Sequence, residues 1–267
     1  MITRSPIAGL DAVDAHAHLG PYSLFFIPCS GAASMVAVMD RTGVRVTVLS
    51  AHRAIQQDAH LGNSDTLAAI DAHPDRIAGY AVVNPWQDPD RQLERVAADP
   101  RFVGIKVHPS LHRYPVSGAR YASVWSFAER TGCPVLSHTG HGSEYDGPAA
   151  FDPVADRHPA AQIILGHAGI TPAGVDEAIA VAARHPGLVL EVCGSQMTGA
   201  LIADMVARVG SGRVLFGSDF PFIDQRMSLG RLVCAELGDT DLRNILAANA
   251  RRLFRWRPLP AGPKAVL

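Results

Sequence analysis

The chain has 267 residues, of which 48% are hydrophobic and 18% charged, so it can bury a large core and has the usual size of one α/β barrel domain. Its formal net charge of −1 gives no bulk positive field that would attract nucleic acid or an anionic membrane. The first ten residues lack the long apolar run of a signal peptide, and no later uncharged apolar stretch could span a bilayer. We therefore expect a cytoplasmic protein with neither a nucleic-acid nor a membrane partner.

Short β-branched or apolar runs alternate along the chain with longer, alanine-rich stretches of helical period. This alternation is typical of repeated βα units around a parallel sheet. The predicted strands cover residues 12–16, 44–50, 77–83, 102–107, 133–137, 162–166, 188–192 and 214–217. The predicted helices cover residues 33–42, 62–73, 90–98, 123–131, 151–158, 173–185, 198–209 and 227–236. Eight strands, each followed by a helix, predict a closed (β/α)₈ TIM barrel.

A doubly wound open sheet is the competing architecture, but it carries a glycine-rich phosphate loop after its first strand. Here the first strand ends in D-A-H-A-H, from Asp14 to His18. Residues 241–254 predict an extra amphipathic helix at the C-terminus, and residues 256–267 predict an irregular tail. We therefore expect a single TIM-barrel domain over residues 1–267.

Polar side chains gather at the carboxyl ends of the predicted strands, where barrel enzymes carry their chemistry. His16 and His18 lie two residues apart on the first strand, so their side chains point to the same side. His138 ends the fifth strand, His167 follows the sixth, and Asp219 follows the eighth. Such a nitrogen-rich set suits one divalent metal ion, with Zn²⁺ preferred and Mn²⁺, Fe²⁺, Co²⁺ or Ni²⁺ as alternatives.

Six short motifs follow one another through the chain: D-A-H-A-H at Asp14–His18, G-I-K-V-H-P at Gly104–Pro109, S-H-T-G at Ser137–Gly140, G-H-A-G at Gly166–Gly169, G-S-D-F-P at Gly217–Pro221 and N-A-R-R-L-F at Asn249–Phe254. In this order they resemble the amidohydrolase superfamily. The resemblance is to its amidohydrolase-related branch, amidohydrolase 2, which includes aminocarboxymuconate semialdehyde decarboxylase and related aromatic-acid decarboxylases. It covers nearly the whole chain.

The resemblance implies a role for each strand-end residue. His16, His18, His138 and Asp219 would bind the metal, and His167 would stand beside it as the catalytic histidine. Asp219 would also act in catalysis, by taking a proton from a metal-activated water and passing it to the leaving group.

A second set of residues is expected to bind a small, anionic substrate. Lys106 and His108 would share one face of the fourth strand and present a cation and an imidazole to the substrate. Arg113 and His52 are further candidates for this set. In some superfamily members a lysine at the fourth strand is carboxylated and bridges two ions, so a second metal at Lys106 is a less favoured alternative, and a structural salt bridge is another.

The favoured activity is hydrolysis of a small amide, lactone or ester, because the chain is shorter than expected for the best-known decarboxylases of this branch. The alternative is a metal-dependent decarboxylase of an aromatic or unsaturated carboxylic acid, which would use the same groups. Two long connections, Gly20–Gly31 and Pro109–Ala122, could form pocket walls or a lid. They could equally pack at a subunit contact, which leaves a homodimer open.

Overall fold

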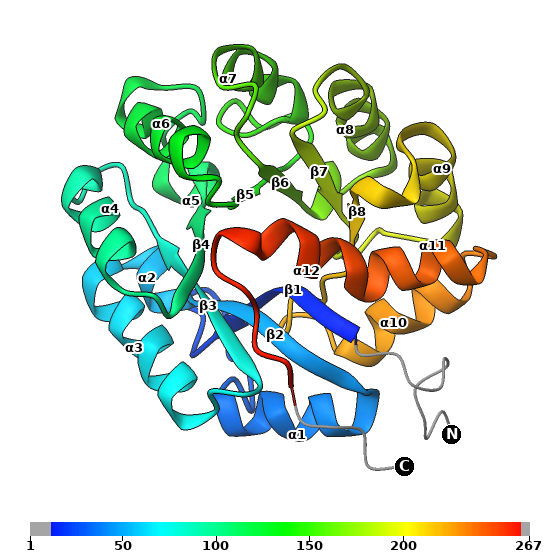
Figure 1. Cartoon of the computed structure of the whole chain (residues 1–267), viewed down its shortest axis with the longest axis horizontal. Coiled ribbons are helices and arrows are strands. Elements are labelled where there is room, and N and C mark those ends of the chain that lie inside the picture. The colour runs from blue at the N-terminus through cyan, green and yellow to red at the C-terminus, as the bar shows by residue number, and fades with distance from the viewer. Residues whose placement is uncertain (1–11, 263–267) are drawn as a thin grey trace.

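Eight parallel strands run around a barrel in chain order (Figure 1), in a computed structural model that describes residues 12–262. Each strand pairs with the next one along the chain, from β1 to β8. Their bounds are β1 (Ala12–Leu19), β2 (Val44–Ala51), β3 (Ile77–Val82), β4 (Phe102–Val107), β5 (Val135–His138), β6 (Ile163–Gly166), β7 (Leu188–Glu191) and β8 (Val214–Leu215). The predicted (β/α)₈ barrel is confirmed.

The helices form an outer ring around these strands (Figure 1). Those that were predicted are α1 (Ala32–Thr42), α3 (Ala59–Ala72), α4 (Pro89–Ala98), α6 (Ala122–Thr131), α7 (Asp152–Arg157), α8 (Pro172–Arg184), α9 (Gly199–Val209) and α10 (Gln225–Val233). Two further helices, α2 (His52–Gln56) and α5 (Pro109–His112), have five and four residues. Helices of one turn have no hydrophobic period to detect, so the sequence did not predict them.

The barrel closes between β1 and the segment that follows β8. The backbone N–H of Asp219 donates to the carbonyl oxygen of His16 over 2.8 Å. Below this contact the buried carboxylate of Asp14 accepts from the backbone N–H of Ser218 over 2.9 Å and from its hydroxyl over 2.5 Å. Burial raises the pKa of Asp14 to about 6, against the lowering effect of these hydrogen bonds. Closure of the barrel therefore brings the first and last strand ends together.

The C-terminal helical segment covers the amino-terminal end of the barrel. It comprises α11 (Asp239–Arg243), a π-helical turn (Asn244–Ala248), α12 (Asn249–Leu253) and a 3₁₀ turn (Phe254–Trp256). Phe254 is fully buried among the residues that fill the barrel, and its ring lies 5.9 Å from that of Tyr80. The predicted extra helix is thus present, broken by a π-helical turn, and it closes this end of the barrel to solvent.

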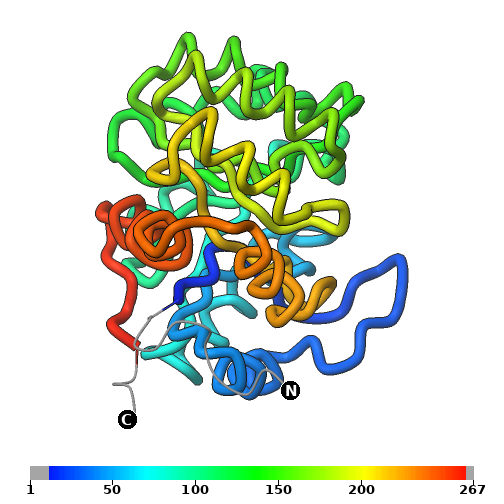
Figure 2. Tube along the Cα trace, turned by 90° about the vertical axis from the view of Figure 1, so that its right-hand side faces the viewer, coloured from blue at the N-terminus to red at the C-terminus, as the bar shows by residue number. Residues whose placement is uncertain are grey.

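The opposite end of the molecule carries the connection Gly20–Gly31. Figure 2 shows this segment, between β1 and α1, projecting on the side away from α12. Its tip is apolar and exposed, with Phe26 88% and Leu24 73% accessible. The carboxyl end of the barrel therefore has an apolar rim on one side.

No helix within residues 12–262 is both long and apolar enough to cross a bilayer. Residues 257–262 have no regular structure, whereas Trp256, the first residue of the predicted tail, ends a 3₁₀ turn. Residues 263–267 and 1–11 lie outside the described part of the chain. The single domain over 1–267, the cytoplasmic location and the homodimer stay predictions.

Candidate active site

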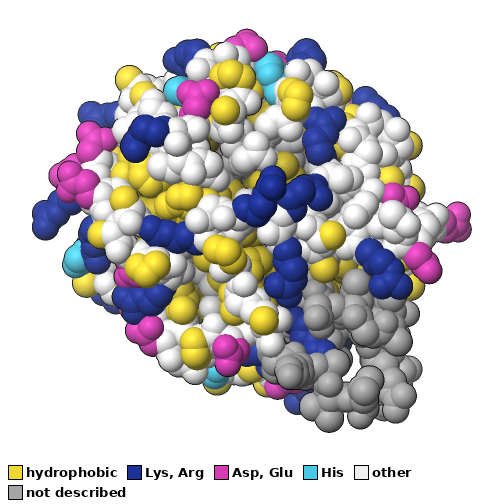
Figure 3. All heavy atoms as spheres, in the orientation of Figure 1, with side chains coloured by type: hydrophobic (Ala, Val, Ile, Leu, Met, Phe, Trp, Pro, Cys, Tyr) yellow, Lys and Arg dark blue, Asp and Glu magenta, His cyan; other side chains and the backbone are white. Residues whose placement is uncertain are grey.

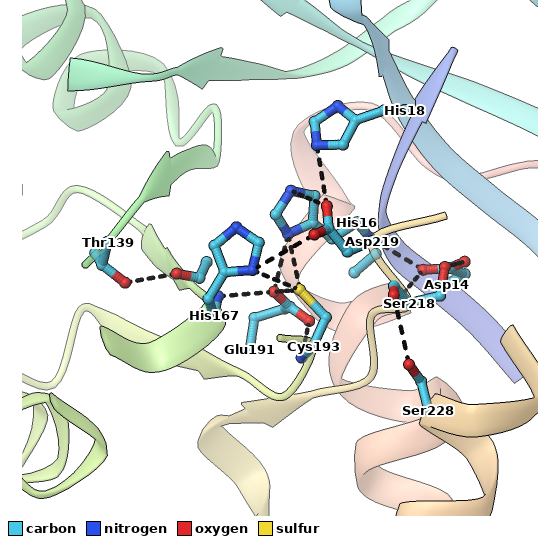
Figure 4. Close-up of polar contacts among 12 residues, drawn as sticks. Asp14, His16, His18, Thr139, His167, Glu191, Cys193, Ser218, Asp219 and Ser228 are labelled. Atoms are coloured by element: carbon cyan, nitrogen blue, oxygen red, sulfur yellow. Dashed lines mark hydrogen bonds and ion pairs between the residues drawn. The ribbon is translucent and has the colours of Figure 1, made fainter. Parts of the chain in front are cut away.

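Polar side chains on β1 and β7, and just beyond β6 and β8, point toward one another at the carboxyl end of the barrel (Figure 4). His16 and His18 come from β1, His167 follows β6 directly, and Asp219 lies four residues beyond β8. His167 and Asp219 adopt left-handed backbone conformations, with φ of 65° and 61°. Residues other than glycine adopt this region sparingly, and such strain tends to persist where function requires a particular side-chain direction.

Three of the predicted metal ligands converge. The Nε2 atom of His18 lies 3.2 Å from Oδ1 of Asp219, and the Nε2 atom of His16 lies 3.8 Å from the same oxygen. Two ligands bound tetrahedrally to one ion at ~2.1 Å lie ~3.4 Å apart, so these separations fit a shared metal. Oδ1 of Asp219 is also buried without a hydrogen-bond partner among the described residues. This set of donor atoms can therefore hold a cation.

His138 lies in the same cavity but belongs to a neighbouring group. Its ring stacks on that of His108, with centroids 4.1 Å apart and planes 11° apart, and lies 4.9 Å from the ring of His167. The possible ligand atoms of His138, His108 and Asp146 lie within 4.8 Å of one another. The structure thus brings His138 beside the other three predicted ligands without adding it to their group.

Glu191, at the end of β7, is a member of the site that the sequence analysis did not include. Its buried carboxylate accepts a hydrogen bond from Nδ1 of His16 over 2.9 Å and another from the backbone N–H of His167 over 3.1 Å. With Nδ1 carrying the proton, the lone pair of His16 lies on Nε2, the atom that faces Asp219. Burial raises the pKa of Glu191 to about 7. An acidic residue at the end of a fully buried strand was the signal that could have identified it.

Replacement of Glu191 by Gln is expected to weaken metal binding by about 10- to 100-fold, the usual effect of losing the carboxylate behind a histidine ligand. The amide can donate to His16 as well as accept from it, so the tautomer of the imidazole is no longer fixed. The measurement is a competitive titration of the metal-free protein with a chromophoric chelator. Glu177→Gln is the matched control, because Glu177 also accepts from an imidazole, His141, over 3.1 Å but on the exposed surface. Equal affinities for the two variants would contradict this role of Glu191.

Cys193 links Glu191 to the predicted catalytic histidine. Its thiol donates to Oε2 of Glu191 over 2.9 Å, and its sulfur lies 3.0 Å from Nδ1 of His167. The sulfur can therefore accept from Nδ1, which leaves Nε2 of His167 as the basic nitrogen. Burial is the main cause that lowers the pKa of His167, to about 3, so this imidazole is neutral at pH 7.

Lys106, on β4, is fully buried beside the converging ligands. Its Nζ lies 3.0 Å from Nε2 of His16, and no carboxylate of the described residues lies within the 4.0 Å of an ion pair. Burial lowers the pKa of Lys106 to about 8, partly offset by the negative charge of Asp219. The lysine is therefore a buried cation without a structural salt bridge.

A cavity of about 350 Å³ opens above these residues and has one cationic side chain, Lys106, in its wall. Tyr22 and Phe25 of the Gly20–Gly31 connection contribute to its lining, together with Phe222. The complete lining comprises His18, Tyr22, Phe25, Lys106, His108, His138, His167, Ile170, Gly194, Ser195, Asp219, Phe222 and Ile223. The site therefore combines apolar and aromatic walls with a few convergent polar groups, as small-molecule sites do.

Two of the predicted substrate-binding residues lie elsewhere. His52 is buried against His18, with ring centroids 4.8 Å apart, and its Nδ1 lies 2.9 Å from the carbonyl oxygen of Gly20. It supports the wall of the site from outside the lining. Arg113 ends α5 in a left-handed conformation, with φ of 50°, and its exposed side chain does not line the cavity.

The chain is similar in sequence to proteins of known activity. The family model described as amidohydrolase matches residues 13–256. The gamma-resorcylate decarboxylase of Rhodococcus jostii (strain RHA1) is 27% identical over 68% of this chain and 71% of its own length. The gamma-resorcylate decarboxylase of Polaromonas sp. (strain JS666) is 24% identical over 82% of this chain and 86% of its own length.

A solved structure shares the fold. The dihydroxybenzoic acid decarboxylase of Polaromonas sp. JS666, with bound manganese and the inhibitor 2-nitroresorcinol, has a TM-score of 0.70 and is 18% identical over 92% of this chain and 97% of that one. At this identity the likeness supports the fold alone.

The prediction from the sequence that the activity is hydrolysis was wrong. Both curated relatives are named as decarboxylases, and they favour the alternative activity. The preference depended on the short chain, yet the alignment extends over 86% of the Polaromonas decarboxylase. Chain length therefore does not separate the two chemistries here.

Proposed function

Because the chain belongs to the amidohydrolase family, we propose that it is a metal-dependent decarboxylase that removes CO₂ from a small aromatic carboxylic acid. The observation that carries this proposal is the buried Lys106 beside the converging His16, His18 and Asp219, at the base of a cavity with aromatic walls. This arrangement suits a planar, anionic substrate.

The proposed cofactor is one divalent ion held by His16, His18 and Asp219, with His138 as the candidate further ligand. Two imidazoles and a carboxylate suit Zn²⁺ and Mn²⁺ alike, and manganese is the metal bound in the Polaromonas structure. When bound, such an ion acts as a Lewis acid that polarises substrate oxygen atoms and stabilises the negative charge that develops on them.

The remaining steps are proposed for the side chains of this chain. The ammonium group of Lys106 binds the substrate carboxylate or an adjacent oxygen, while Phe25 and Phe222 pack against the ring. An anion bound beside His167 favours the protonated form of its imidazole, in opposition to the effect of burial. Nε2 of His167 then donates its proton to the ring carbon that carries the carboxylate.

Loss of CO₂ completes the reaction. As the bond between the ring carbon and the carboxylate breaks, its electron pair returns to the ring and CO₂ leaves, so one proton is consumed for each molecule of CO₂. The proton on His167 is then replaced from solvent. The apolar walls limit access of water to the reacting carbon.

The test combines elemental analysis with a product assay. Protein purified without added metal is analysed for metal, reconstituted with Mn²⁺ or Zn²⁺, and incubated with hydroxybenzoates, while released CO₂ is trapped and quantified. We expect about one equivalent of metal and CO₂ release that a chelator abolishes. The proposal is wrong if the metal-loaded protein releases no CO₂ from the panel but hydrolyses lactones, amides or esters.

A further inference from the structure

A second cavity lies at the amino-terminal end of the barrel, remote in the fold from the site described above. Its volume is about 430 Å³, within the range of ~300–1,000 Å³ typical of small-molecule sites. Gln162 precedes β6, Arg213 precedes β8, and Arg252 and Arg255 come from the C-terminal helical segment. The cavity is therefore bounded by the base of the barrel on one side and by the segment that covers it on the other.

The charged side chains that line this cavity all carry the same sign. They are Arg213, Arg252 and Arg255, and no Asp or Glu is part of the lining. Figure 3 shows Lys and Arg side chains gathered over the middle of the face that α12 crosses. Within residues 12–262, none of the three forms an ion pair with a carboxylate. Like charges held together without a counterion repel one another, so an anion bound among them would be stabilised.

The hydrogen bonds of these arginines leave donors free. Nη1 and Nε of Arg213 donate to backbone carbonyls at the ends of α8 and α9, which accounts for that residue as a structural cap. Nη2 of Arg252 donates to the carbonyl oxygen of Gly212 and to the side chain of Asn249. Arg255 donates only through Nε, to the carbonyl oxygen of Arg252. Nη1 of Arg252 and both terminal nitrogens of Arg255 thus have no acceptor among the described residues.

Capping of the ends of α8 and α9 therefore explains why Arg213 is present. It explains neither the cavity nor the free donors of Arg252 and Arg255. A guanidinium with both terminal nitrogens free presents the planar fork that matches a phosphate or carboxylate group. We propose that this cavity is a binding site for a small ligand with at least two negative charges, whose anionic groups are phosphate or carboxylate.

Calorimetric titration of the metal-loaded enzyme tests this proposal with two probes, inorganic phosphate and succinate, at constant ionic strength. At least one probe should bind saturably. The affinity should fall about 10-fold or more in the Arg252→Gln/Arg255→Gln variant, because both guanidinium groups with free donors are removed. Tighter binding of phosphate would identify a phosphate ester as the ligand class, and tighter binding of succinate would identify a polycarboxylate.

Two control variants keep this test separate from the proposed decarboxylase. Arg208→Gln removes an exposed arginine that already pairs with Asp176 and Asp204, and it should leave binding unchanged. Lys106→Met should leave unchanged the part of the binding that depends on Arg252 and Arg255, because Lys106 lines the cavity at the other end of the barrel. The proposal is overturned if neither probe binds, if the double variant binds as wild type does, or if only Lys106→Met loses binding.

A local signal comes from Trp256, which lines the same cavity. Saturating phosphate or succinate should change its fluorescence, and the change should disappear in Trp256→Phe. A fluorescence change that persists in Trp256→Phe would place the anion elsewhere and contradict the proposal.

Discussion

Asp219→Asn is expected to lower the turnover number for CO₂ release by ~10³-fold or more and to deplete the protein of metal. The carboxylate oxygen Oδ1 is the atom on which His16 and His18 converge, and a neutral amide oxygen is a much weaker ligand for a divalent cation. Loss of several kcal/mol of transition-state stabilisation, at about 1.4 kcal/mol per tenfold, gives this magnitude. Metal content is measured by elemental analysis and turnover by trapped CO₂.

The fold should survive this substitution. Asn adopts the left-handed conformation of residue 219, with φ of 61°, more readily than most residues do. Oδ1 of Asp219 also has no hydrogen-bond partner among the described residues, so no structural hydrogen bond to that atom is lost. The melting temperature of the metal-free variant should therefore equal or exceed that of metal-free wild type. Asp224→Asn, at the half-buried N-cap of α10, is the control and should retain activity. Full activity of Asp219→Asn would remove Asp219 from the mechanism.

The barrel was predictable because its signal repeats. Each strand from Phe102–Val107 to Val214–Leu215 is almost entirely buried on both faces, which appears in the sequence as a short apolar run. The order of strands followed because parallel neighbours need helical crossovers. The helices α2 and α5 were missed because a single turn has no measurable period.

The sequence predicted those residues of the site that lie at the carboxyl ends of strands. Strand alternation placed His16 and His18 on one side, and barrel closure brought Asp219 to them. Side-chain direction within loops follows no such rule. Arg113 was grouped with Lys106 by its place in the chain, yet the left-handed turn at the end of α5 leaves it exposed outside the cavity. Glu191 was left out because its role depends on a contact with a residue 175 positions away.

Lys106→Met is expected to lower kcat/KM by about 10- to 150-fold, which corresponds to loss of one charged hydrogen bond of ~1.5–3 kcal/mol. Lys106 is the cation in the wall of the active-site cavity, and Met keeps a similar length and apolar stem. If the ammonium binds the substrate equally in the ground and transition states, KM rises and kcat is unchanged; if its hydrogen bond strengthens as CO₂ leaves, kcat falls. Steady-state kinetics of CO₂ release separate these cases.

The folding stability of Lys106→Met tests the role of the lysine independently of the kinetics. The folded pKa of Lys106, about 8, lies below its ordinary value of 10.5, so the unfolded chain binds more protons between these pH values. Metal-free wild type should therefore gain stability relative to Lys106→Met as the pH rises from 8 to 10.5, and the variant should be the more stable of the two at pH 7. Arg113→Met removes an exposed cation outside the cavity and should change neither kinetics nor stability. If Lys106→Met instead unfolds more easily at pH 7 and keeps its kcat/KM, the lysine is structural, and the cavity must recognise an anionic substrate by other means.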